Sequence, residues 1–183
     1  MGDAREHDVR EQVAGHEVGH VVVCGVDGSP GGQRALGWAI EEAGRRGAVV
    51  RAVSAWSWDG VDELDAPSTP DEAVARARSV LDATVEAVLH GVTAAATVER
   101  VTQRGSPSDA LCIAALDAEL LVLGSHGHGG VHDKLLGSTT ERTLHHAPCP
   151  VVVVPDPRRV EKNVRRARAQ QERLEGPRPN QVV

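Results

Sequence analysis

The chain has 183 residues with no Phe, no Tyr and three Trp, so its core must consist of aliphatic side chains. The formal net charge of -6 argues against a general nucleic-acid binder, and no specific nucleic acid is expected as a partner. No apolar run approaches the ~18 residues of a membrane span. The three cysteines are odd in number and far apart, and the first residues are too charged for a signal peptide. These features predict a cytoplasmic protein with reduced thiols.

Three segments differ in composition. Residues 1–19 are charged and weakly patterned, and we expect an N-terminal extension there. Residues 20–155 alternate apolar runs with helical patterns and form the expected domain. Residues 156–183 carry eight Lys/Arg against four Asp/Glu with at best a thin helical stripe. A solvated or disordered tail is the expectation for this last segment, and contact with an acidic partner is the alternative.

Apolar runs rich in β-branched residues predict strands near 21–26, 49–55, 97–103, 120–123 and 151–154. Three of the intervening segments begin with an N-cap residue followed by proline, namely Ser29-Pro30, Thr69-Pro70 and Ser106-Pro107, and each predicts a helix. The fourth predicted helix starts at Ser138, where Ser138 and Glu141 have the spacing of a capping box. This alternation predicts the α/β class, an open parallel sheet with helices on both faces.

A glycine-rich run joins the fourth strand to the fourth helix. Residues 124–138 follow the pattern G-x2-G-x9-G-S, with glycines at Gly124, Gly127 and Gly137 before Ser138. The first two glycines are expected to adopt positive φ and to let the backbone approach a ligand closely. The helix N-terminus at the far end offers free N–H groups and a partial positive charge. The run therefore predicts an anion site, most often a phosphate site.

A carboxylate follows the first strand, in Asp27-Gly28-Ser29. Open α/β sheets bind ligands beyond the carboxyl ends of strands, where the winding direction switches. If the first and fourth strands are neighbours, Asp27 faces the glycine run across one crevice. Its carboxylate would then accept hydrogen bonds from ribose or base while the loop and Ser138 hold phosphates. Asp27 as a simple turn-former and the glycine run as a flexible loop remain the alternatives.

Three segments, 22–29, 124–138 and 144–154, together resemble the universal stress protein family, and the resemblance covers residues 20–155. It implies an adenine nucleotide alpha hydrolase-like fold, with a five-stranded parallel sheet of order 3-2-1-4-5. It also implies ATP binding, because the ATP-binding branch of the family carries the glycine pattern. A homodimer through the edge strand Val151–Val154 is implied as well, and such pairing would cover an apolar sheet edge.

The resemblance also assigns roles by motif position. Gly25 and Asp27 would lie against adenine and ribose, and Ala55 would line the adenine pocket. Ribose and phosphates would be held by Gly124, Gly127, Gly137, Ser138 and Thr139. A Mg²⁺ or Mn²⁺ ion carried by the nucleotide is expected.

Two histidines, His126 and His128, occupy loop positions where relatives often carry basic residues. Histidine gains charge below about pH 6.5, so we expect nucleotide affinity to rise on mild acidification. The alternative is that both are exposed histidines with no energetic role. A metal site made of His126, His128 and His132 is disfavoured, because the loop cannot pre-arrange three imidazoles and phosphates compete for the space.

Two catalytic patterns are weighed and set aside. His16-Glu17-Val18-Gly19-His20 matches H-E-x-x-H, but a β-branched run begins at Val21 and leaves no room for the required helix to continue. The glycine run lacks the terminal lysine of a P-loop, although Lys134 lies mid-loop. We therefore expect a nucleotide-dependent stress-response regulator. Slow ATP hydrolysis is the alternative, and a module that binds partners through its basic tail is a third reading.

Overall fold

Five short strands pair in parallel into one sheet in this computed structural model, which describes residues 20–58, 69–93, 96–127 and 136–175. They are β1 (Val21–Gly25), β2 (Val49–Trp56), β3 (Val98–Arg104), β4 (Leu120–Gly124) and β5 (Val151–Val154). The order is β3-β2-β1-β4-β5, and Val22 of β1 lies opposite both Val50 of β2 and Leu120 of β4. The predicted class, strand order and adjacency of the first and fourth strands are confirmed.

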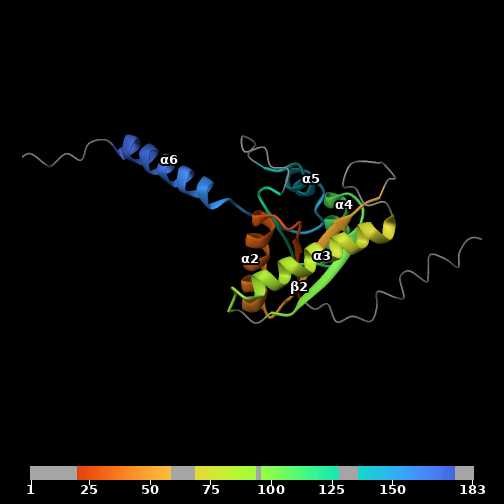
Figure 1. Cartoon of the computed structure of the whole chain (residues 1–183). Coiled ribbons are helices and arrows are strands. Elements are labelled where there is room, and N and C mark those ends of the chain that lie inside the picture. Colours follow the sequence, from red (N-terminus) through yellow and green to blue (C-terminus); the bar gives the residue numbers. More distant parts are fainter. Residues whose placement is uncertain (1–19, 59–68, 94–95, 128–135, 176–183) are drawn as a thin grey trace, which may run out of the picture.

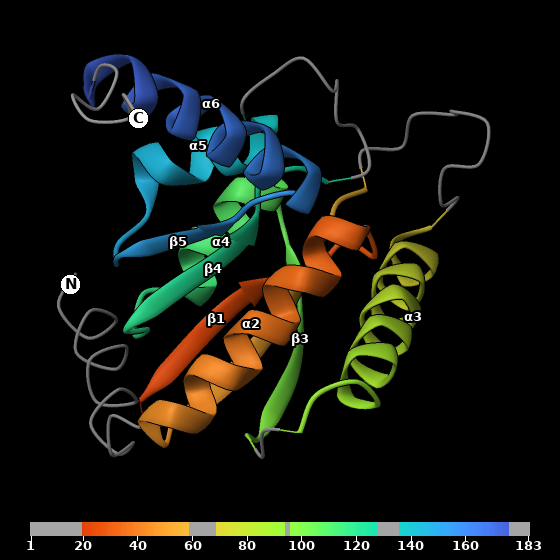
Figure 2. The same ribbon diagram turned by 90° about the vertical axis from the view of Figure 1, so that its left-hand side faces the viewer.

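Helices cover both faces of the sheet (Figure 1). The described helices are α2 (Pro30–Arg46), α3 (Pro70–Leu89), α4 (Pro107–Ala114), α5 (Ser138–His146) and α6 (Pro157–Glu175), of which α6 projects away from the sheet. Figure 2 shows α2 and α3 in front of the sheet and α4 behind it, with α5 beside α4. The result is a three-layer sandwich whose strands all point their carboxyl ends toward the same edge.

The helix starts follow from their sequences. Ser29, Thr69 and Ser106 are the N-caps of α2, α3 and α4, and each side-chain oxygen accepts a hydrogen bond from the backbone N–H three residues later. Proline stands at the first helical position in all three, where its missing N–H costs nothing. At the other end of α2, Gly47 adopts the left-handed conformation with φ 65°. Capping residues in the local sequence therefore determine where these helices begin and where α2 ends.

An aliphatic core lies on each side of the sheet. Leu36 and Ile40 of α2 pack with Leu81 of α3 on one side, and all three are fully buried. On the other side, Leu111 of α4 packs against Leu121 of β4. Val, Leu, Ile and Ala fill both layers, as the lack of Phe and Tyr requires.

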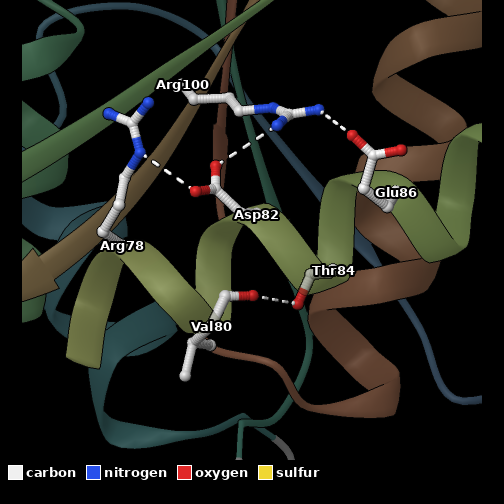
Figure 3. A network of polar contacts seen from close by, with 6 residues as sticks. All are labelled: Arg78, Val80, Asp82, Thr84, Glu86 and Arg100. Carbon is white, nitrogen blue, oxygen red and sulfur yellow. Dashed lines mark hydrogen bonds and ion pairs between the residues drawn. The ribbon is translucent and has the colours of Figure 1, made fainter. Parts of the chain in front are cut away.

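An ionic network fastens α3 to the edge strand β3 (Figure 3). Arg100 of β3 donates to Asp82 at 3.3 Å and to Glu86 at 2.5 Å, and Arg78 donates to the other oxygen of Asp82 at 3.2 Å. These groups are half-buried or exposed, so each pair contributes only ~0.2–1 kcal/mol. Their effect is to set the position of α3 on the sheet, and the first half of α3 lines the cavity described below.

The tail is helical rather than disordered as far as Glu175. Its side chains from Val160 to Leu174 are all exposed, so the expected solvation is observed. Residues 176–183 and the extension 1–19 lie outside the described residues. Within the described ranges, no helix combines the length and apolarity that a membrane crossing needs.

Candidate functional site

A cavity of about 610 Å³ opens at the carboxyl ends of β1, β2 and β4. It is lined by Gly25, Asp27, Ala55, Gly124, His126, Gly127, Gly137, Ser138 and Thr139, among others. These are all the predicted site residues except His128, which lies outside the described residues. The fold therefore brings one set of residues from four separate segments to one cavity, at the switch point where strand order reverses.

Asp27 stands where β1 meets α2. Its Oδ1 accepts hydrogen bonds from the backbone N–H of Ser29 at 3.0 Å and from the Ser29 hydroxyl at 2.6 Å. A β-carbon added to Gly127 would lie only 2.3 Å from Asp27 Oδ2, and one added to Gly32 would lie 2.8 Å from Oδ1. The carboxylate thus sits between the start of α2 and the glycine loop, as the adjacency of β1 and β4 predicted.

The first two glycines of the motif serve close approach rather than unusual dihedral angles. Within the described ranges the glycines with positive φ are Gly28, Gly47 and Gly105, so the predicted positive φ of Gly124 and Gly127 is wrong. A β-carbon at Gly124 would instead lie 2.6 Å from the carbonyl carbon of Gly31. Real β-carbons do not approach backbone so closely, so glycine lets the start of α2 pack directly on the loop.

The far end of the loop returns to the end of β4. The backbone N–H of Gly137 donates to the carbonyl oxygen of Ser125 at 2.8 Å. The Thr140 hydroxyl donates to the carbonyl oxygen of Gly124 at 2.9 Å. Together these bonds hold the first turn of α5 beside the start of the glycine motif.

The start of α5 differs from the predicted capping box. Gly137 is the N-cap, with φ -71° and ψ 155°, and no described side chain caps this helix. Ser138 is the first helical residue instead, and Glu141 donates its N–H to the carbonyl oxygen of Gly137 at 2.9 Å. The helix begins at Ser138 as predicted, but the Ser138 side chain makes no capping hydrogen bond, so the predicted capping box is wrong. The exposed Ser138 hydroxyl and the first N–H groups of α5 consequently line the cavity without a side-chain cap.

Several lining residues were missed by the sequence reading. Trp56 ends β2 and Ser57 follows it, while Ala73, Arg76, Ala77 and Val80 come from α3. The guanidinium carbon of Arg104 lies 5.8 Å from the centre of the Trp56 ring, within cation–π range. Arg76 is the only Lys or Arg among the described lining residues. The sequence alone does not show which residues of α3 meet the cavity, because this depends on how α3 crosses the sheet.

The histidine readings have separate outcomes. His126 lines the cavity, and its Nδ1 lies 3.2 Å from the Ser125 hydroxyl. The described residues contain no group of three metal-ligating side chains, and His128 and His132 lie outside them. His20 forms an ion pair with Glu119 at the amino ends of β1 and β4, opposite the cavity. This position of His20 supports the interpretation of the H-E-x-x-H pattern as a chance match. The other residues of the pattern, 16–19, lie outside the described residues.

The three cysteines are free. Cys24, directly before Gly25, is fully buried, and burial together with the nearby Asp27 charge raises its pKa far above the ordinary thiol range. Burial also raises the pKa of Cys112 and of Cys149. All three remain protonated near neutral pH and act as small apolar groups, in agreement with the predicted reduced thiols.

The chain is similar to known proteins over the described domain. The model of the universal stress protein family matches residues 20–155. The universal stress protein Rv2005c of Mycobacterium tuberculosis is 36% identical over 132 residues, which are 72% of this chain and 44% of that protein. A universal stress protein of Mycolicibacterium smegmatis is 35% identical over 144 residues, covering 77% of this chain and 47% of that protein. The chain thus spans less than half the length of these curated relatives.

Two solved structures share the fold. The universal stress protein UspA from Lactobacillus plantarum superposes with a TM-score of 0.59 at 26% identity, over 74% of this chain and 97% of that one. A universal stress protein solved in complex with cAMP superposes with a TM-score of 0.55 at 26% identity, over 74% of this chain and 96% of that one.

Proposed function

The chain belongs to the universal stress protein family, and from that premise we propose that its cavity binds an adenine nucleotide, ATP by preference. The observation that carries the proposal is the start of α5, which has no side-chain cap and returns to the glycine motif beside Asp27. Support comes from the neighbour at 26% identity that was solved with cAMP. The cavity of about 610 Å³ also lies within the usual size range of small-molecule sites.

The two ends of the cavity suit the two ends of a nucleotide. At one end, the free N–H groups and positive dipole of α5, with the Ser138 hydroxyl, would receive phosphates. At the other, Val53, Ala55 and Ala77 offer an apolar surface for adenine, and Asp27 stands between the two to accept from ribose hydroxyls. The residues assigned by motif position keep those roles in this proposal. A Mg²⁺ or Mn²⁺ ion would arrive with the phosphates, because no described cluster of ligands is built to hold one.

We place the chain among nucleotide-responsive regulators of the cytoplasm rather than rapid hydrolases. The Ser125 hydroxyl, which lies beside His126, is buried and is not among the lining residues, and the loop lacks the P-loop lysine. Nucleotide occupancy would instead set the positions of α5 and the loop, which Gly137 and Thr140 tie to the end of β4.

The exposed edge of the sheet supports a homodimer. β5 lies at the end of the strand order and consists of four valines that are each partly exposed. An apolar edge strand with unpaired backbone groups is a template for another strand, and pairing with the same strand of a second copy closes it symmetrically.

Native mass spectrometry of the purified chain tests this proposal. A mass increment equal to an adenine nucleotide, or one gained on adding ATP, is the expected result. Incubation with ATP and Mg²⁺ should yield at most one ADP per protein. Repeated turnover that is lost in Ser138→Ala would establish slow hydrolysis instead, and absence of nucleotide binding at millimolar ATP would contradict the proposal.

A further inference from the structure

Helix α6 projects from the domain beyond its first turn (Figure 1). Every side chain from Val160 to Leu174 is exposed. The start of the helix is nevertheless fixed, because Asp156 accepts from the Arg158 backbone N–H at 2.8 Å and forms an ion pair with Arg34 of α2 at 3.7 Å. An isolated helix of 19 residues is marginal in water, so a helix of this length gains most of its stability by packing on something.

Four apolar residues and one glutamine of α6 have the spacing of a coiled coil. Val160, Val164, Ala167, Gln171 and Leu174 recur at alternating intervals of four and three residues. Three of them are large and exposed, Val160 at 41%, Val164 at 43% and Leu174 at 79%. A narrow seam with this spacing fits one facing helix, whereas packing on a globular core needs a wider stripe. The spacing therefore indicates that the surface covering α6 is itself a helix.

We propose that α6 pairs with α6 of a second copy of this chain, in antiparallel orientation along this seam. The helix begins directly after Pro155 and Asp156, and those two residues follow the exposed edge strand β5. A twofold contact brings the same elements of both copies together. One axis can therefore pair both the two β5 edges and the two α6 helices. The inference extends the proposed edge dimer without depending on nucleotide binding.

The charges beside the seam select this orientation and one register. An antiparallel pair that sets Val164 against Ala167 of the second copy also sets Glu161 against Arg168 of the second copy, twice by symmetry. Sliding the pair by one heptad would instead oppose the two Arg168 side chains or, in the other direction, the two Glu161 side chains. A parallel pair would set Arg168 against the uncharged Asn163. Opposite charges meet in one arrangement and like charges disfavour its neighbours, which is how helical pairs achieve specificity.

The side chains of the seam favour a second helix over a lipid surface. Helices that bind membrane interfaces commonly carry bulky apolar anchors such as Trp, Phe and Leu. The seam of α6 offers two valines, an alanine, a glutamine and one leucine, which suit close helix packing better.

Charge exchange in the full-length chain tests the pairing. The dimer dissociation constant would be measured by sedimentation equilibrium for Glu161→Arg, for Arg168→Glu and for the double exchange. Each single variant places like charges together at two sites and should raise the constant about tenfold. The double exchange restores opposite charges and should return the constant to the wild-type value. Glu172→Arg makes the same charge change away from the seam and should leave the constant unchanged.

The outcomes separate the possible explanations. Single variants that dimerise like wild type, or a double exchange that fails to restore dimerisation, would overturn the α6 pairing. The β5 edge carries no charge, so an edge dimer alone cannot produce rescue by exchange. Co-sedimentation with vesicles that contain an anionic lipid tests whether α6 binds membranes instead. Vesicle binding that is lost in Val164→Asp while the dimer constant stays unchanged would assign α6 to membranes and overturn the proposal.

Discussion

The N-termini of α2 and α5 border the same cavity, and their chemistry differs. At the start of α2, the Ser29 oxygen accepts from the Gly32 N–H at 3.0 Å, and the Ser29 hydroxyl donates to Asp27 at 2.6 Å. At the start of α5, Gly137 provides no side chain, and no described side chain replaces it. The Gly32 N–H of α2 is thus bonded within the fold, while Ser138 and Thr139 at the start of α5 line the cavity without a side-chain cap. The difference indicates which helix can receive an anion.

The local sequences explain this difference. A serine N-cap stabilises a helix by about 1 kcal/mol relative to alanine, and glycine is only a few tenths of a kcal/mol worse than serine. The α5 start therefore gives up little stability and leaves its first N–H groups without a side-chain partner. The close packing of Gly124 on Gly31 places the capped start of α2 directly against the end of β4, where the glycine motif begins.

Breaking the contact between Gly124 and the start of α2 should have the largest effect on stability and on ATP affinity. Gly124→Ala would place a β-carbon 2.6 Å from the Gly31 carbonyl carbon, and backbone must move to accommodate it. We expect a loss of about 1–3 kcal/mol in the free energy of unfolding, together with most of the ATP affinity. Urea denaturation and isothermal titration calorimetry measure the two effects.

The matched control for this change is Gly37→Ala in the middle of α2. Its β-carbon would lie 3.8 Å from Val88 Cγ1, an ordinary contact. This variant should keep its ATP affinity and gain about 0.5–1 kcal/mol of stability. Equal behaviour of the two variants would show that the close approach at Gly124 has no role.

Removing the cap of α2 should affect stability more than binding. Ser29 is 2% exposed, so Ser29→Ala loses a buried hydrogen bond to Gly32 and should lower the free energy of unfolding by about 1–2 kcal/mol. Thermal or urea denaturation measures the loss. A variant as stable as wild type would mean that the α2 start is not closed by this side chain.

Removing the Ser138 hydroxyl at the start of α5 should affect nucleotide binding more than stability. Ser138 is exposed and makes no cap, so Ser138→Ala should change the free energy of unfolding by less than about 0.5 kcal/mol. The loss of one hydrogen bond to phosphate should weaken ATP binding by about tenfold. Calorimetric titration of both serine variants checks the contrast, and weaker binding in Ser29→Ala than in Ser138→Ala would reverse our assignment.

The smallest expected effect concerns His126, which lines the cavity beside the proposed phosphate end. Replacing its imidazole removes at most one hydrogen bond to the nucleotide, so His126→Gln should weaken ATP binding only about two- to threefold. Calorimetric titration measures the change, and a loss of more than about tenfold would give this histidine a larger role than we assign to it.

The sequence predicted those features that depend on neighbouring residues. Ser29-Pro30 and Thr69-Pro70 carry the signals of their helix starts within a few positions, and both predictions are confirmed. The helix start at Ser138 is confirmed as well, but the capping box with equally good local spacing is wrong, since Gly137 is the N-cap and its N–H bonds to Ser125 across the loop. The reason for glycine at Gly124 likewise lies in α2, far away along the chain.

The helical structure of the tail could not be predicted from its sequence either. Its composition of Arg, Ala, Gln and Glu favours helix as much as disorder, and α6 forms although its side chains are exposed from Val160 to Leu174. Pattern alone indicated a thin stripe. The fact that the domain leaves this stripe uncovered became visible only in the structure (Figure 1).

Backbone amide NMR tests the central claim most directly. The shifts caused by ATP would be compared with those caused by adenosine, so that the difference reports phosphate alone. We predict that the largest differences fall on the N–H groups of Ser138 and Thr139, at the open start of α5, while the Gly32 N–H, which is bonded to Ser29, changes little. Phosphate-dependent shifts centred on Gly32, or none at the start of α5, would contradict the account.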